Sequence, residues 1–166
     1  MKKTYAVALG GVFAALAVVI MTLGGIIPVA TYITPVLCML LLQFVNHSCG
    51  SRIGWTWYTA VGILGLLLSP DKEAAAVFVA VGYYPIVKSR FDRLPASWLL
   101  KAVYFNAVTI LLYWLLLCVV GMEQLIADFD GIGLWGMIVA LLLGNVCFFL
   151  VDRLLKILDR IIERGK

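Results

Sequence analysis

The chain has 166 residues, of which 64% are hydrophobic and 13% charged, and its formal net charge is +4. Soluble domains are about 45–50% apolar and about 25% charged, so this composition excludes an ordinary water-soluble domain and favours a membrane protein. The net positive charge is better explained by Lys and Arg residues that lie beside a membrane than by a nucleic-acid partner. We therefore expect anionic lipids at the cytoplasmic face as partners, and no nucleic acid.

Six apolar stretches predict an all-α integral membrane protein, a six-transmembrane-helix bundle. The stretches cover residues 5–27, 28–46, 53–68, 70–87, 98–120 and 132–151, and residues 121–131 form the longest expected outer loop. Most stretches are near the ~20 residues that a helix needs to cross the hydrocarbon. The expected helices and the short loops between them account for the whole sequence, so we expect residues 1–166 to form a single membrane domain.

The basic residues predict the orientation of the bundle. If both termini are cytoplasmic (N-in/C-in), every Lys and Arg except Lys72 falls on the cytoplasmic side. Cytoplasmic loops of membrane proteins carry an excess of Lys and Arg, so this topology is strongly preferred over its inverse. We expect a multi-pass protein of a cell membrane, a bacterial plasma membrane in particular.

The first helix carries two overlapping ladders of small residues. Four-residue steps keep a ladder on one face, and small side chains let a second helix approach closely. Such a face serves either packing within the bundle or docking of a separate subunit. The ladders are Ala6, Gly10 and Ala14, and Val7, Gly11 and Ala15.

Residues 24–34 interrupt the second stretch with two glycines, a proline and several hydrogen-bonding side chains. Thr34 and Pro35 have the pattern of an N-cap and a first helical residue, because proline is tolerated where no amide donor is needed. Non-helical backbone at membrane depth survives only beside protein or a wet cavity. We expect either a lid or solute-facing loop over residues 24–34, or a proline kink in one long helix.

A charged cluster opens the fourth stretch at its outer end. In the structural explanation, Ser69 caps the helix, Pro70 follows, and Asp71 and Glu73 face the positive end of the helix dipole. In the functional explanation, Asp71, Lys72 and Glu73 border an outward-facing site for a polar or cationic solute. The sequence leaves both explanations open.

Polar residues inside the later helices are few. Asn106, Thr109 and Tyr113 share one face of the fifth helix, and Asn145 lies midway along the sixth. Such groups must point inward and find partners, so we expect hydrogen bonds between helices. Residues 152–166 continue the last helix as an amphipathic cytoplasmic tail, which would lie on the inner membrane surface or pack on a partner.

The architecture resembles the substrate-binding S component of an energy-coupling factor (ECF) transporter. The resemblance implies a vitamin-like solute, a transmembrane coupling subunit, and two separate ATPase subunits that supply the energy. The small-residue face would dock on the coupling subunit, and residues 24–34 would cover the solute. The expected docking residues are Ala6, Gly10, Gly11, Ala14 and Ala15, and the expected solute contacts are Thr31, Tyr32, Thr34, Asp71, Glu73 and Trp135.

Two other classes of protein fit the sequence. A structural or regulatory subunit of a larger membrane complex would need the small-residue face but no solute site. An intramembrane enzyme would need ionisable residues that converge at one depth, and the sequence indicates only the rim formed by Asp71 and Glu73. We therefore predict no catalytic residues, no cofactor and no metal site.

Overall fold

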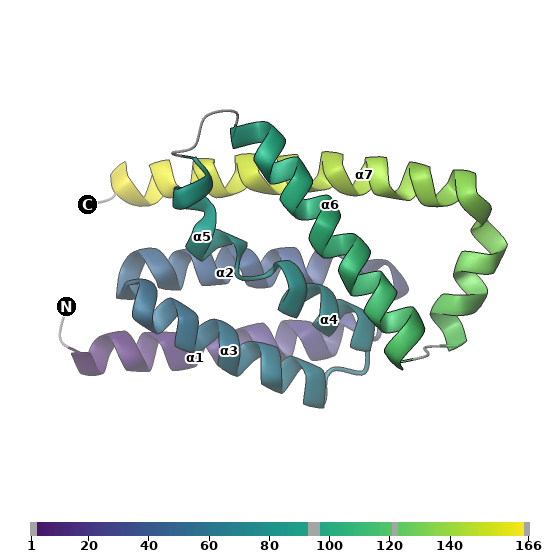
Figure 1. Cartoon of the computed structure of the whole chain (residues 1–166). Helices are drawn as coiled ribbons and strands as arrows, with labels where there is room; N and C mark the ends of the chain where they lie inside the picture. Colours follow the sequence, from purple (N-terminus) through teal and green to yellow (C-terminus); the bar gives the residue numbers. More distant parts are fainter. Residues whose placement is uncertain (1–2, 93–96, 121–122, 165–166) are drawn as a thin grey trace.

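The computed structural model describes residues 3–92, 97–120 and 123–164, and these residues form helices joined by short turns (Figure 1). Lys2, Arg93 and Lys166 lie outside this part of the chain. The elements are α1 (Lys3–Gly24), η1 (Pro28–Thr31), α2 (Ile33–Cys49), α3 (Ser51–Leu68), α4 (Lys72–Val81), α5 (Tyr84–Phe91), α6 (Ser97–Leu115), η2 (Leu116–Val120) and α7 (Glu123–Arg164).

Helix α2 is the centre of the packing, because it contacts α1, α3, α4, α5 and α7. One side of α2 joins a core with α1, α3 and α4, in which Leu42 and Phe78 are fully buried. Its other side reaches a second core with α5 and α7, in which Met39, Tyr84 and Leu155 are buried. The mostly apolar helix α2 therefore ties the first half of the chain to the last helix.

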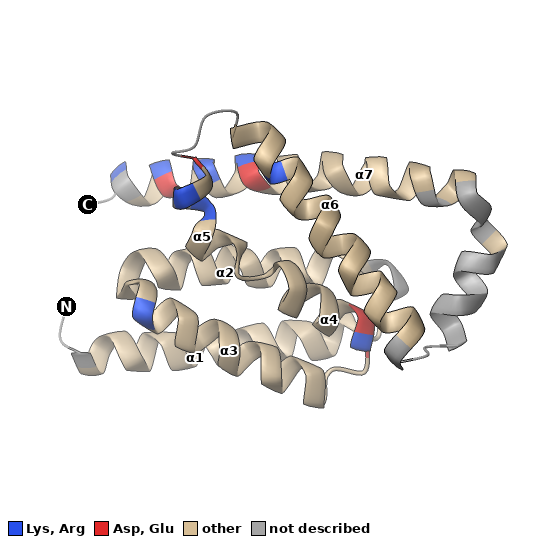
Figure 2. Ribbon diagram, in the orientation of Figure 1, with Lys and Arg blue, Asp and Glu red and all other residues tan. Residues whose placement is uncertain are grey.

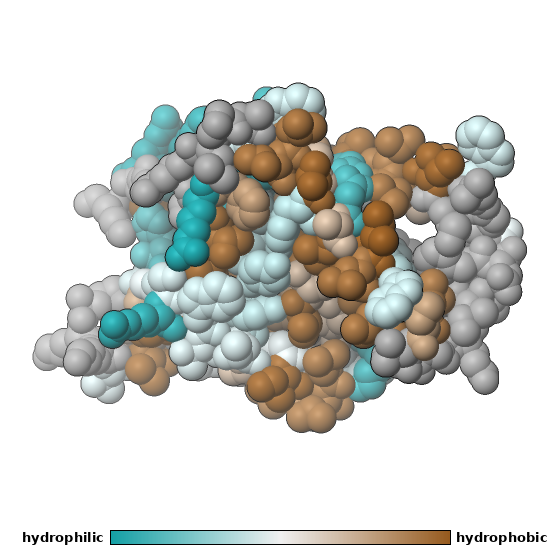
Figure 3. All heavy atoms as spheres, in the orientation of Figure 1, coloured by the Kyte–Doolittle hydropathy of each residue, from teal (hydrophilic) through white to brown (hydrophobic). Residues whose placement is uncertain are grey.

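Among the described residues, three segments are long and apolar enough to cross a membrane: Thr4–Gly24, Ser97–Cys118 and Ile138–Ile162. The helix Ile33–Cys49 is apolar but shorter. Many large apolar side chains remain exposed, and Figure 3 shows them spread over the visible face of α6. Exposed apolar surface of this extent is typical of helices that face lipid.

The charged residues gather at the two ends of the bundle. Figure 2 shows the basic residues of α3, α5 and the C-terminal half of α7 at the end where the chain begins and finishes, with the charged start of α4 at the opposite end. We call these the inner end and the outer end, following the orientation expected from the sequence. The helices thus place at one end of the bundle the described basic residues that the sequence assigned to one side of the membrane.

The stretch 70–87 does not form the single helix that its hydropathy predicts. Helix α4 ends at Val81 and α5 begins at Tyr84, with Pro85 in the first turn of α5. Proline supplies no amide donor, and in a continuous helix its ring would clash with the carbonyl group four residues earlier, so the chain bends before it. A Cβ atom on Gly82 would lie 2.3 Å from the Phe78 carbonyl oxygen, which is why the tight turn needs glycine.

Helix α7 also differs from the prediction, because Glu123–Arg164 is one helix of 42 residues. The expected outer loop over residues 121–131 is helical from Glu123, while residues 121 and 122 lie outside the described part. The expected tail is the continuation of the same helix, and it contacts α2 rather than standing apart.

Candidate functional site

A cluster of three polar side chains lies toward the outer end of the bundle. The Glu73 carboxylate oxygen Oε1 accepts hydrogen bonds from the hydroxyls of Tyr32, at 2.9 Å, and Tyr113, at 2.7 Å. The two hydroxyl oxygens are 3.1 Å apart. The three residues come from the N-cap of α2, the first turn of α4 and the last turn of α6, so the cluster joins segments distant in sequence.

The Glu73 carboxylate has no cationic partner among the described residues. Lys72 is adjacent in sequence, but its Nζ donates to the backbone carbonyls of Leu66, at 2.8 Å, and Leu67, at 3.4 Å. The phenols of Tyr32 and Tyr113, rather than a cation, therefore supply the hydrogen bonds to this carboxylate.

Asp71 has a structural role at the start of α4. Its Oδ1 accepts a hydrogen bond of 2.9 Å from the backbone amide of Ala74, so Asp71 is the N-cap. The prediction that Ser69 caps this helix is wrong, because the Ser69 hydroxyl lies 3.2 Å from the Met21 carbonyl oxygen and 3.0 Å from that of Asp71. An aspartate two residues later outcompetes it, since a cap must reach the second or third amide of the helix.

The irregular segment 24–34 packs against this end of the bundle. A Cβ atom on Gly25 would lie 2.6 Å from Pro70 Cγ and 2.9 Å from the backbone nitrogen of Asp71. A Cβ atom on Gly24 would lie 2.0 Å from Cγ2 of Thr34. The two glycines therefore allow the chain after α1 to lie directly against α2 and the start of α4.

Thr34 is not the N-cap that the sequence predicts. Helix α2 begins one residue earlier, at Ile33, and the Thr34 hydroxyl donates 3.0 Å back to the Ala30 carbonyl oxygen. The turn η1 supplies that carbonyl, so the Thr34 hydroxyl bonds to the preceding turn instead of capping α2. Thr34 is buried, whereas Thr31 closes η1 and is half-buried.

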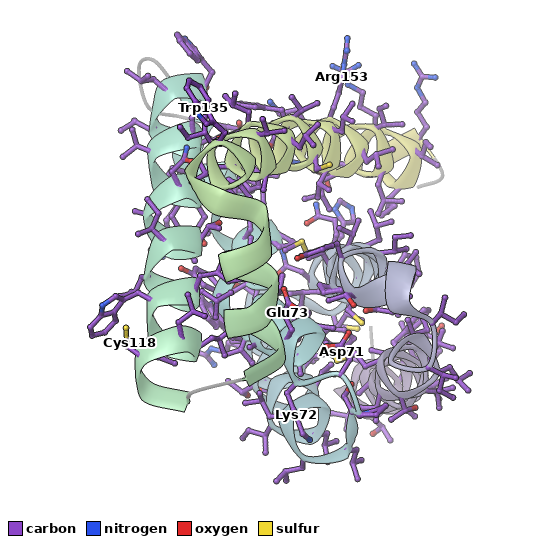
Figure 4. All side chains as sticks on the ribbon, turned by 90° about the vertical axis from the view of Figure 1, so that its right-hand side faces the viewer. Asp71, Lys72, Glu73, Cys118, Trp135 and Arg153 are labelled. Carbon is purple, nitrogen blue, oxygen red and sulfur yellow. The ribbon has the colours of Figure 1, made fainter. Side chains whose placement is uncertain are left out.

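Trp135 does not belong to the outer cluster. Its side chain is 81% exposed, and Figure 4 shows it well apart from Asp71 and Glu73, which lie close to each other. Two of the six expected solute contacts, Tyr32 and Glu73, are joined by a direct hydrogen bond. Tyr113, which the sequence placed on a polar face of the fifth helix, completes the cluster and could have been found from that spacing.

The two small-residue ladders of α1 lie in different surroundings. Ala6 and Gly10 are buried and Ala14 is half-buried, and a Cβ atom on Gly10 would lie 3.5 Å from Ile53 Cγ2. Gly11 and Ala15 are exposed, and a Cβ atom on Gly11 would meet nothing within 4 Å. The first ladder therefore packs within the bundle, and the second leaves an open face.

A second polar cluster lies toward the inner end, and it is built from ion pairs. The Lys101 ammonium is 2.9 Å from Asp152 Oδ1 and 2.5 Å from Asp92 Oδ1. Asp152 also accepts a hydrogen bond of 2.5 Å from the Tyr84 hydroxyl and lies 3.1 Å from the Lys156 ammonium. Lys101, Asp152 and Tyr84 are buried, so charges and phenol together join α5, α6 and α7.

A further ion pair extends this inner network toward α2. The buried Lys88 ammonium is 2.9 Å from Asp159 Oδ2, and the side-chain amide of Gln43 donates to Asp159 Oδ1. The expectation that ionisable residues converge only at the outer rim is therefore wrong. Asp152, Lys156 and Asp159 recur at helical spacing, so they lie on one face of α7, apart from its exposed arginines. That spacing in the sequence is the signal that could have revealed the network.

Asn106 and Asn145 exchange reciprocal hydrogen bonds of 3.0 Å and 2.9 Å between α6 and α7. This confirms the expected hydrogen bonding between helices. Two hollows also occur in the described residues, but neither is lined by an expected solute contact. No group of three metal-ligating side chains occurs among these residues.

Comparisons with known proteins identify no relative of this chain: no family model, no curated protein and no solved structure matches it. Within the described residues, the structure itself defines an all-helical protein with three helices long and apolar enough to cross a membrane.

Proposed function

We propose that the chain is the membrane-embedded solute-binding subunit of an ECF-type importer of a vitamin-like micronutrient, energised by separate ATPase subunits. The observation that carries this proposal is the Glu73 carboxylate, which two phenols hold without a cation to neutralise it. Its second oxygen, Oε2, makes no hydrogen bond to a described residue. A carboxylate oriented in this way is suited to a solute that supplies a positive charge or hydrogen-bond donors.

The packing around Glu73 supports the same proposal. Segment 24–34 lies against the start of α4, where it would cover a solute bound beside Glu73. Tyr32 comes from the end of this segment and touches Glu73 directly. Movement of the segment would therefore remove one of the two phenols, which would couple opening of the cover to release of the solute.

We propose further that six segments cross the membrane with both termini cytoplasmic. Single cysteines in place of Arg90, Arg160 and Asp128, in a cysteine-free background, test this topology with an impermeant label. We expect external labelling at position 128 and protection at positions 90 and 160. Labelling at 90 or 160 with protection at 128 would reverse the orientation.

The exposed ladder of α1 supports docking of a coupling subunit through Gly11 and Ala15. Gly11→Trp should leave folding intact, because no described atom is near the new side chain, but it should prevent close approach of a partner helix. Gly10→Trp is the matched control, since it faces Ile53 and should disturb the fold itself. If Gly11→Trp protein retains every co-purifying partner, this face does not dock.

The experiment that tests the function is purification from the native membrane followed by mass spectrometry of associated proteins. A solute-binding subunit should bring down a transmembrane coupling subunit and two ATPase subunits, and the assembled complex should take up a micronutrient from a vitamin and metal panel. Recovery of the chain with neither ATPase nor uptake would refute the proposal.

The alternative is a structural or regulatory subunit of a larger membrane complex. One observation favours it: neither of the two hollows described above is lined by Tyr32, Glu73 or Tyr113. Such a subunit would use the open face of α1 without binding a solute. Co-purification with a membrane complex that lacks ATPases would select this alternative.

A further inference from the structure

Two adjoining hollows flank α5 toward the inner end of the bundle. The first, of about 370 Å³, lies between α5 and α6 and is lined by Tyr83, Val87, Arg90, Phe91 and Tyr104. The second, of about 290 Å³, lies between α5, the end of α2 and the start of α3, and is lined by Asn46, Ser51, Trp55, Ile86, Val87 and Arg90. Because Val87 and Arg90 border both, the two hollows can hold different parts of one ligand.

Arg90 is the charged residue that lines these hollows, and its charge is not neutralised. It is exposed and makes no ion pair with a described residue, whereas Lys88, Lys101 and Lys156 each lie within 4.0 Å of an aspartate. A guanidinium presents a planar fork of donors that matches a phosphate group. The position therefore favours an anion such as a phosphate.

The two hollows differ in chemistry. Aromatic rings form most of the first wall: the Phe91 and Tyr104 ring centroids are 5.2 Å apart, and those of Tyr83 and Tyr104 are 6.1 Å apart. The second hollow has polar residues at the ends of α2 and α3. Asn46 Oδ1 is buried and has no hydrogen-bond partner among the described residues. Buried polar atoms of this kind are normally satisfied, which points to a ligand.

We propose that these hollows bind one anionic glycerophospholipid of the cytoplasmic leaflet. Its phosphate pairs with Arg90, an acyl chain lies against the aromatic first hollow, and hydroxyls of a polyol headgroup donate to Asn46 Oδ1 in the second. The basic end of the bundle attracts such a lipid, because anionic lipids enrich beside cytoplasmic Lys and Arg. The inference requires a membrane around the chain but no solute at Glu73.

The test uses the full chain purified in detergent and titrated with phosphatidylglycerol or phosphatidylcholine of the same acyl chains, with bound lipid counted by native mass spectrometry. We expect the wild-type chain to retain one phosphatidylglycerol in preference to phosphatidylcholine. Arg90→Gln should reduce retention by about tenfold, the loss expected for a hydrogen-bonded charge pair. Glu73→Gln should retain the lipid, which separates this inference from the proposed function.

Arg153→Gln is the matched control, because Arg153 is also exposed and without an ion pair among described residues, and Figure 4 shows it pointing away from the bundle. We expect it to retain phosphatidylglycerol within about twofold of wild type, because a single outward charge adds only modest attraction. Equal losses in the two variants would mean general surface attraction and would overturn the site. A wild-type chain without preference for phosphatidylglycerol, or displacement of the lipid by millimolar inorganic phosphate, would also overturn it.

Discussion

The inner and outer polar clusters use similar side chains but reach opposite electrostatic outcomes. In the inner network, Lys101 and Lys156 surround Asp152, and the Tyr84 hydroxyl adds a hydrogen bond to it. In the outer cluster, two phenols surround Glu73, and no described cation approaches it. The charge of a carboxylate that has cations on several sides is neutralised within the protein. A carboxylate that is held only by phenols keeps its negative charge, which a ligand can then pair with.

The difference separates a cluster that holds helices together from one able to bind a ligand. Burying charges is costly, and pairing repays that cost only when geometry and hydrogen bonding are good, as they are around Asp152. Phenols can orient a carboxylate without neutralising it. We therefore assign the inner network to stability and the outer cluster to recognition, and the following predictions test this division.

Breaking the inner network should have the largest effect on stability. Lys101→Met leaves the buried Asp152 with weaker compensation, which should cost about 3–5 kcal/mol of unfolding free energy. Lys156→Met is the control: its side chain is 44% exposed, so its loss should cost no more than about 1 kcal/mol. Denaturant unfolding in detergent measures both, and equal costs would contradict a buried, structural role for Lys101.

Enlarging Gly25 should push segment 24–34 away from the outer cluster. The new side chain of Gly25→Val would overlap Pro70 and the backbone of Asp71, so we expect about 1–3 kcal/mol of destabilisation. Gly11→Val is a suitable control, because its Cβ would have no neighbour within 4 Å. A Gly25 variant as stable as wild type, with unchanged solute affinity, would show that the contact has no role at this end.

Removing one phenol from each cluster compares the two directly. Tyr84→Phe deletes a hydroxyl that is buried against a charged group, which should cost about 1.5–3 kcal/mol of stability. Tyr113→Phe leaves Glu73 with Tyr32 and access to other partners, so its cost should be about 1 kcal/mol or less. Thermal unfolding of both variants provides the measurement, and the reverse order would invert the assignment of the clusters.

The sequence predicts the helical class well, because long apolar stretches leave few alternatives in a membrane. Helix ends were harder to predict. The hydropathy of residues 70–87 hides the turn before Pro85, and the capping pattern at Ser69 was less favourable than the cap that Asp71 forms. Which of two possible residues caps a helix depends on the path of the backbone that leads into the helix. Hydropathy gives no information about that path.

The candidate site was only partly predictable, because it depends on contacts between distant segments. Tyr32 and Glu73 were expected near one another, but Tyr113 joins them from a helix forty residues further along. Trp135 was expected beside them as a solute contact, but its position in the sequence does not specify which way its side chain points, and the side chain is exposed. The inner network was missed because Lys101 was counted only as a cytoplasmic basic residue and Asp152 only as part of the amphipathic tail, so no contact between them was expected.

The most direct test of the division between the clusters is calorimetric binding of a vitamin and metal panel to the purified chain. We expect a solute that supplies positive charge or hydrogen-bond donors to bind wild type, and Glu73→Gln to weaken that binding by about tenfold or more through loss of a charge-assisted hydrogen bond. Asp71→Asn should bind normally, because asparagine also caps helices. Equal affinity in folded wild-type and Glu73→Gln protein would contradict the assignment of the outer cluster to recognition.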